Sequence, residues 1–113
     1  MCLKSHLFWK LLSAIADGQL PVEFNLKQNF PNPFNPSTSI QYQLLEAGFV
    51  TLEVFDVNGR KIKTLINSQQ NAGYKTVMWN GTNDAGMPVS TGMYIYSVRS
   101  GDKVINKRMT FMK

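Results

Sequence analysis

Length, composition and charge restrict the chain to a few classes of protein. Its 113 residues fit one domain and leave no room for a separate catalytic domain. A single cysteine rules out an internal disulfide, and no run approaches the roughly 18 consecutive apolar residues of a membrane-spanning helix. The 12 basic and 7 acidic residues give a net charge of +5, but the basic residues are scattered, so we expect a solvated surface and no nucleic-acid partner.

The N-terminal segment, residues 1–23, differs from the rest because its apolar residues recur at helical spacing. Lys4 fits the charged region of a signal peptide, and Ala14-Ile15-Ala16 fits its small-x-small cleavage site. Lys10, however, splits the apolar stretch, so a degenerate signal peptide, the tail of an upstream segment and a misplaced start codon all stay open. We therefore expect one folded domain over residues 24–113.

After residue 23 the chain reads as short alternating runs rich in Val, Ile, Thr, Tyr and Phe, separated by Gly, Asn, Asp and Pro, which is typical of β-strands and turns. Val50, Leu52 and Val54 fall on one face of such a run, and we expect them and Trp79 to be buried. The expected strands are 39–44, 49–56, 60–66, 74–80, 93–99 and 103–112, with 24–28 as a seventh if it also pairs. This spacing predicts a β-sandwich or barrel, and a sandwich is the commoner answer at this length.

Two segments between the strands carry further expectations. Asn58-Gly59 supplies the positive φ angles of a tight hairpin turn, so the runs on either side should pair. The proline-rich stretch 29–37 cannot be an interior strand. We expect a rigid, polyproline-like lead-in whose Phe30 and Phe34 pack onto one end of the fold, although such segments also serve as ligands for aromatic grooves.

Residues that could carry chemistry are few. The only histidine and the only cysteine, His6 and Cys2, lie outside the β domain, so neither a nucleophile arrangement nor a zinc set can be built within it. We therefore expect no enzyme activity and no catalytic, cofactor or metal site. Loop 80–86 does offer oxygen ligands at a spacing that suits calcium, but side-chain bonding of Asn83 and Asp84 to the loop backbone explains the same residues.

Three aromatic residues, Trp79, Tyr94 and Tyr96, offer a platform for a sugar or a base. Aromatic residues that alternate along strands more often belong to the core. The sequence leaves both interpretations open, so a carbohydrate-binding module is one alternative function.

Four blocks of sequence resemble a known family. They are QNFPNPFNPSTSIQYQL at 28–44, VTLEVFDVNGRKIKTL at 50–65, AGYKTVMWNGTNDAGMPVSTGMYIYSV at 72–98 and KRMTFMK at 107–113. In their order, spacing and residues these blocks are similar to the type A C-terminal sorting domain of the type IX, or Por, secretion system. That family is related to the immunoglobulin-like domain of flagellar hook-capping proteins. The resemblance implies an all-β fold, an immunoglobulin-like antiparallel β-sandwich of about six to seven strands. Asn80 departs from the pattern, since similar sequences often have Asp after the Trp.

The resemblance also implies a function as a protein-transport signal. In that family the domain ends a larger exported protein, the outer-membrane translocon recognises it in the periplasm, and a sortase-like peptidase usually removes it. For this chain it implies export, with an extracellular or outer-membrane surface location, and the type IX translocon and the peptidase as partners. The sequence shows no cargo ahead of the domain, which indicates a fragment, a truncated gene or an orphan signal module.

The last strand is where we expect recognition. Lys107, Arg108 and Lys113 are its basic residues and are expected to contact the translocon, while Met109 and Phe111 share a face that is expected to be buried. We further expect a monomer without a cofactor. The main alternative is a structural immunoglobulin-like module without signal function.

Overall fold

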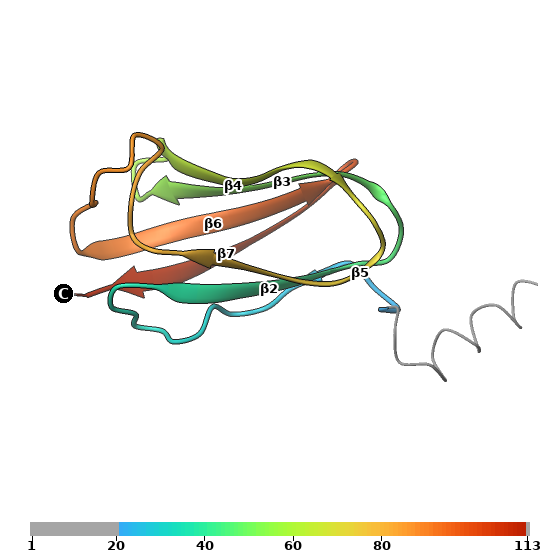
Figure 1. The fold of residues 1–113 in the computed structure, drawn as a ribbon, viewed down its shortest axis with the longest axis horizontal. Helices are drawn as coiled ribbons and strands as arrows, with labels where there is room; N and C mark the ends of the chain where they lie inside the picture. The colour runs from blue at the N-terminus through green and yellow to red at the C-terminus, as the bar shows by residue number, and fades with distance from the viewer. Residues whose placement is uncertain (1–20, 113) are drawn as a thin grey trace, which may run out of the picture.

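The computed structural model describes residues 21–112, which form seven β-strands in two antiparallel sheets (Figure 1). One sheet has the order β1-β2-β5 and the other the order β4-β3-β6-β7. The strands are β1 Asn25–Leu26, β2 Thr38–Leu44, β3 Gly48–Asp56, β4 Lys61–Gln70, β5 Gly73–Trp79, β6 Gly92–Ser100 and β7 Lys103–Phe111. The predicted all-β fold and its strands are confirmed. The signal-peptide interpretation and Lys113 fall on residues outside the described range.

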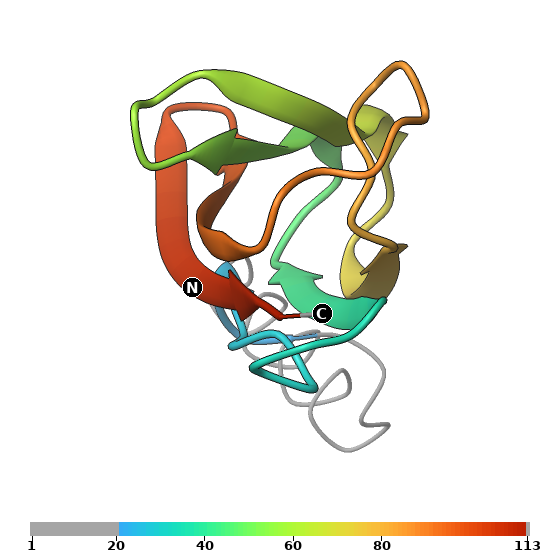
Figure 2. The same cartoon turned by 90° about the vertical axis from the view of Figure 1, so that its left-hand side faces the viewer.

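The two sheets lie face to face, as the end-on view in Figure 2 makes clear. The chain changes sheet three times, between β2 and β3, between β4 and β5, and through the long connection from β5 to β6. The two hairpins β3–β4 and β6–β7 stay within the larger sheet. Residues 21–112 contain no helix that is long and apolar enough to cross a membrane.

The inner faces of both sheets supply the core, because side chains alternate across each strand. Val50, Leu52 and Val54 are fully buried on β3, and Trp79 is 1% exposed, so this part of the sequence prediction is confirmed. Each such side chain contributes about 1.5–3 kcal/mol through removal from water. The remaining core residues are Leu26, Phe34, Ile40, Tyr42, Leu44, Tyr94, Tyr96, Val98, Met109 and Phe111.

The strand β4 extends four residues beyond the predicted end at Ile66 and reaches Gln70. The added residues, 67–70, are polar and mostly exposed, so they lack the alternation on which the prediction depended. They pair with the first half of β3, for example Gln69 with Phe49. Backbone pairing on an edge strand, which needs no buried side chain, therefore sets the end of β4.

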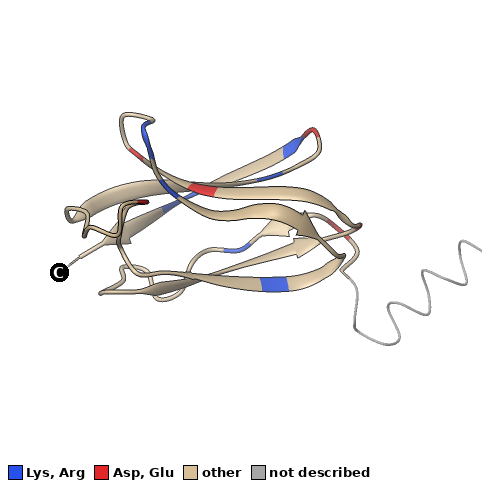
Figure 3. Ribbon diagram, turned by 45° about the horizontal axis from the view of Figure 1, so that its top comes forward, with Lys and Arg blue, Asp and Glu red and all other residues tan. Residues whose placement is uncertain are grey.

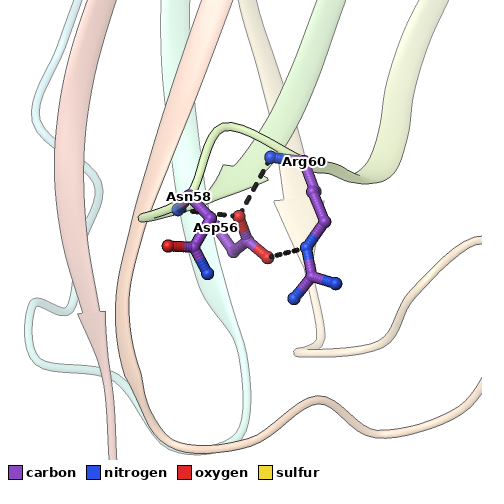
Figure 4. Close-up of polar contacts among 3 residues, drawn as sticks. All are labelled: Asp56, Asn58 and Arg60. Carbon is purple, nitrogen blue, oxygen red and sulfur yellow. Dashed lines mark hydrogen bonds and ion pairs between the residues drawn. The ribbon is translucent and has the colours of Figure 1, made fainter.

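The β3–β4 hairpin turn contains Asn58-Gly59, but only Gly59 has a positive φ, at +86°. The N–H of Gly59 donates to the carbonyl of Asp56 at 3.0 Å, so the turn begins at Asp56 and is one residue longer than the expected Asn-Gly turn. The Asp56 carboxylate accepts hydrogen bonds from the backbone N–H groups of Asn58 and Arg60, and Arg60 Nε lies 3.0 Å from its Oδ2 (Figure 4). These contacts lower the pKa of Asp56, and the hydrogen bond from the backbone N–H of Arg60 contributes most.

The proline-rich segment forms bends and single bridges, so the expected polyproline-like geometry is wrong. Phe34 packs in the core as predicted, but Phe30 is 78% exposed. The N–H and C=O of Phe30 both bond to Ser39 in an antiparallel bridge. Residues opposite each other share a face of the pair, and Ser39 faces away from the core because Ile40 faces into it. Phe30 therefore points outward with Ser39.

Candidate recognition site

Two of the three predicted recognition residues can be placed, and they lie on opposite faces of β7. Lys107 is half-buried and stands opposite Tyr96, on the face that Met109 shares. Arg108 is exposed and stands opposite Ile95 on the outer face. A strand alternates its side chains, so neighbouring residues cannot form one cluster on one face. Lys113 lies outside the described residues.

The end of β7 is part of the core, as expected for Met109 and Phe111, which are 1% and 3% exposed. The ring of Phe111 stacks on Phe34 with centroids 4.9 Å apart and lies 6.4 Å from Trp79. Trp79 also meets Tyr94 edge-on at 5.4 Å. The C-terminal strand thus closes an aromatic cluster at one end of the sandwich, and its loss would expose that cluster.

The proline-rich segment also covers the outer edge of the last part of β7. The N–H of Phe34 donates to the Thr110 carbonyl and the N–H of Met112 donates to the Phe34 carbonyl, both at 3.0 Å. Thr110 N–H donates to Asn32 Oδ1 at 3.0 Å, and Gln28 Nε2 donates to the Arg108 carbonyl at 2.7 Å. Sequence reasoning missed this contact, because the partners are about 80 residues apart and no local pattern relates them.

The aromatic platform interpretation is wrong, because Trp79, Tyr94 and Tyr96 are all buried. Their polar atoms bind the chain itself. Trp79 Nε1 donates to the Thr82 carbonyl and the Tyr94 hydroxyl donates to the Ser90 carbonyl. No part of these three rings is available to stack on a sugar or a base.

The Tyr96 hydroxyl joins the two sheets at their β1–β7 side. It donates to the Lys27 carbonyl at 2.7 Å and accepts from the Asn29 N–H at 2.8 Å. Burial raises the pKa of Tyr96 to about 12, and the hydrogen bond from Asn29 opposes this rise. The sequence marked Tyr96 as a strand residue but gave no sign of its partners.

Loop 80–86 uses its oxygen atoms within the fold. Asn83 Oδ1 accepts from the N–H groups of Ala85 and Met87, and Asp84 Oδ1 accepts from the N–H of Thr64 on β4. Side-chain bonding therefore accounts for Asn83 and Asp84. Within residues 21–112, no three His, Cys, Asp or Glu side chains gather in a way that would hold a metal ion.

The charged residues are spread over strands of both sheets, as Figure 3 shows. The ion pairs found within the described range are Arg60 with Asp56 and Lys61 with Glu53, both at the β3–β4 hairpin. The basic residues that line the β7 side of the sandwich belong to neither pair. They are Lys103, Lys107 and Arg108.

The two face-to-face antiparallel sheets and their closing C-terminal strand define an immunoglobulin-like β-sandwich module. The family model of the FlgD Ig-like domain matches residues 35–103. The chain belongs to this family. A comparison with curated proteins finds no match.

Solved structures with a similar fold include proteins linked to type-IX secretion and to flagellar hook capping. Dimeric latent PorU from Porphyromonas gingivalis aligns with a TM-score of 0.62 and 19% identity over 80% of this chain and 9% of PorU. PorZ of the same organism, an essential surface component of its type-IX secretion system, aligns with a TM-score of 0.52 and 22% identity over 88% of this chain and 12% of PorZ. FlgD from Xanthomonas campestris, a protein of flagellar hook capping, aligns with a TM-score of 0.55 and 20% identity over 86% of this chain and 73% of FlgD.

At these identities the likeness establishes the fold. The chain spans 9% of PorU and 12% of PorZ, so it corresponds to one small part of each.

Proposed function

We propose that the chain is a sorting signal that the type IX secretion machinery recognises in order to export an attached cargo protein across the outer membrane. The observation that carries the proposal is the last strand, which completes the core and at the same time presents Lys107 and Arg108 without an ion pair among the described residues. The four sequence blocks that resemble type IX sorting domains support it. So does the shared fold with a part of PorZ, which belongs to such a system.

In this proposal the chain acts by being bound and carries no enzyme activity of its own. Its partners are the translocon and a sortase-like peptidase, and it travels through the periplasm to the cell surface or the medium as a monomer. Cargo identity lies in the protein to which the domain is attached, so the domain itself needs no substrate pocket.

A structural module without signal function is the second candidate. The family match to the FlgD Ig-like domain and the alignment with Xanthomonas FlgD favour it, because both relate the chain to a flagellar protein. Both candidate functions are compatible with the same fold, and they differ in their effect on an attached protein. Only a sorting signal moves an unrelated protein out of the periplasm.

The experiment fuses a periplasmic reporter ahead of the full chain in a bacterium with a type IX system and replaces Lys107, Arg108 and Lys113 together with Gln. An exposed charge usually changes stability by only about 0.5 kcal/mol, whereas a charge-assisted contact to a partner contributes about 1.5–3 kcal/mol. We expect the purified triple variant to keep its melting temperature within a few degrees and the fused reporter to stay in the periplasm.

The matched control removes three positive charges elsewhere, with Gln at Lys61, Lys63 and Lys75, and we expect its reporter to leave the cell normally. Deletion of the strand is not informative, since loss of Met109 and Phe111 from the core would unfold the domain. Normal export of the folded triple Gln variant would contradict the assignment of these residues to recognition.

A further inference from the structure

The outer edge of β7 changes character along its length. Thr110 directs both its N–H and its C=O away from β6, toward the proline-rich segment. In an antiparallel pair such residues alternate with residues that bond to the neighbouring strand. By the register of β7 with β6, Val104, Asn106 and Arg108 also direct their backbone groups to the outer edge. The segment 28–34 covers this edge from the Arg108 carbonyl onward.

No strand of the described residues pairs with the first half of the same edge, and β1 of the facing sheet lies near it. Among residues 21–112, no hydrogen bond reaches the outward backbone groups of Val104 and Asn106 or the N–H of Arg108. All three residues are exposed, with Val104 at 44%. Unpaired N–H and C=O groups in a row are a template for one more strand.

The charge beside this open edge selects the kind of strand that fits. Lys103, Lys107 and Arg108 lie on β7, and Lys107 stands opposite Tyr96. None of the three belongs to an ion pair within the described range. A second copy of the chain would place its own three cations against these, and like charges on paired strands are destabilising. A strand with Asp or Glu side chains has the complementary charge.

The free edge of β5 offers a comparison. Ser39 and Gln41 direct backbone groups toward Phe30 and Lys27, away from β5, so their partners Met78 and Thr76 direct theirs to the outside of the sheet. No hydrogen bond reaches these outward groups from the described residues. The strand β5 itself carries one cation, Lys75, whereas β7 carries three. The β5 edge is open like the β7 edge but lacks its charge.

We propose that the export machinery binds this chain by strand addition, in which an extended segment with Asp or Glu side chains pairs with the open edge of β7 between Lys103 and Arg108. The inference rests on the proposed function and specifies how the signal is read. Backbone hydrogen bonds to Val104, Asn106 and Arg108 hold the added strand, and the cations beside the edge select an acidic one. The proline-rich segment limits the pairing to the first half of β7.

The test uses the reporter fused ahead of the full chain and the variant Asn106→Pro. Proline removes the outward N–H and blocks an incoming strand, but it takes no hydrogen bond from the β6–β7 ladder. Thr76→Pro on the open β5 edge is the matched control. We expect export of the reporter to fall by about tenfold with Asn106→Pro, as for the loss of about 1.4 kcal/mol of binding, and to be unchanged with Thr76→Pro. Circular dichroism and melting of each purified chain establish folding.

A second pair of variants tests the charge and serves if Asn106→Pro does not fold. Lys103→Glu with Lys107→Glu reverses two charges at the β7 edge, and Lys63→Glu with Lys75→Glu makes the same change elsewhere. We expect the first pair to hold the reporter in the periplasm and the second pair to export it. Equal export of the reporter with both double variants would overturn the proposal that the partner strand is acidic.

Other outcomes are equally decisive. A folded Asn106→Pro variant that exports like the parent, or retention by Thr76→Pro as well, would overturn strand addition at β7. If sedimentation shows that the parent chain is a dimer and that Asn106→Pro is a monomer, a second copy of the chain occupies the edge. This result would overturn the proposal of an acidic partner strand. If the parent chain itself exports nothing, the proposed function fails, which is a different result from failure of the edge alone.

Discussion

Among single residues, Tyr96 connects the two sheets through its hydroxyl group. Its ring is fully buried on β6, while its hydroxyl bonds to Lys27 and Asn29 at the start of the segment that leads from β1 to the edge of β7. Asn29 is itself 2% exposed, and its side chain donates to Thr38 Oγ1 and to the Pro31 carbonyl. One phenol thus supports the hydrogen bonds that place the proline-rich segment against β7.

We predict that Tyr96→Phe lowers the free energy of unfolding by about 1–3 kcal/mol at pH 7, because the buried N–H of Asn29 loses its partner. The exposed Tyr74→Phe is the control and should change it by less than about 0.5 kcal/mol. Urea denaturation of the three chains measures the difference. Equal midpoints for Tyr96→Phe and Tyr74→Phe would contradict the role of the hydroxyl.

The same phenol predicts a pH dependence. The pKa of Tyr96 is about 12 in the folded chain and about 10 in the unfolded chain. Above pH 10 the unfolded chain loses this proton while the folded chain keeps it, so the stability that Tyr96 contributes is complete below pH 10 and is lost as the pH rises toward 12. The stability gap between the parent and Tyr96→Phe should therefore narrow over pH 10–12. A constant gap in urea midpoints over that range would contradict the raised pKa.

At the scale of elements, β7 is held from three directions. It pairs with β6 along its whole length, the proline-rich segment covers the end of its free edge, and the loop after β5 packs on Phe111. In that loop Gly81 has φ +75°, and a Cβ atom there would lie 3.0 Å from Phe111 Cζ. The ring cannot move away freely, since it stacks on Phe34. The loop and the strand therefore fit together only with glycine at this position.

We predict that Gly81→Ala destabilises the domain more than Gly86→Ala. Both glycines have a positive φ, which costs an alanine about 1–2 kcal/mol, but an added Cβ at Gly86 meets no atom within 4 Å. The crowding against Phe111 should add about 1–3 kcal/mol to the first variant alone. Chemical denaturation of both variants gives this difference directly. Equal losses of unfolding free energy would show that the Phe111 ring moves aside without an energetic cost.

For the whole molecule, alternation in the sequence was sufficient to place the strands and their inner faces. Val50, Leu52 and Val54 illustrate this, because a half-buried strand must repeat every two residues. The same rule failed for 67–70 of β4, where backbone pairing alone continues the strand. It also failed for Phe30, whose direction depends on its bridge to Ser39 and leaves no trace in the local sequence.

The candidate site was predicted only in part. The sequence identified the basic residues of the last strand, but Lys107 and Arg108 alternate across β7 and therefore do not share a face. The open and covered halves of the β7 edge depend on Asn32 and Phe34, which meet the strand only after the sandwich closes. Contacts between the two ends of the chain come from topology, and no spacing rule along the sequence contains them.

The central claim is that this β-sandwich is a signal as well as a fold. The most direct measurement fuses one periplasmic reporter ahead of the full chain and, separately, ahead of the immunoglobulin-like domain of Xanthomonas FlgD, which has the same fold. The reporter is then quantified in the periplasm and outside the cell in a bacterium with a type IX secretion system. We predict export of the reporter with this chain and its retention in the periplasm with the FlgD domain. Retention of both fusions, with this chain folded, would show that the module is structural and would contradict the account.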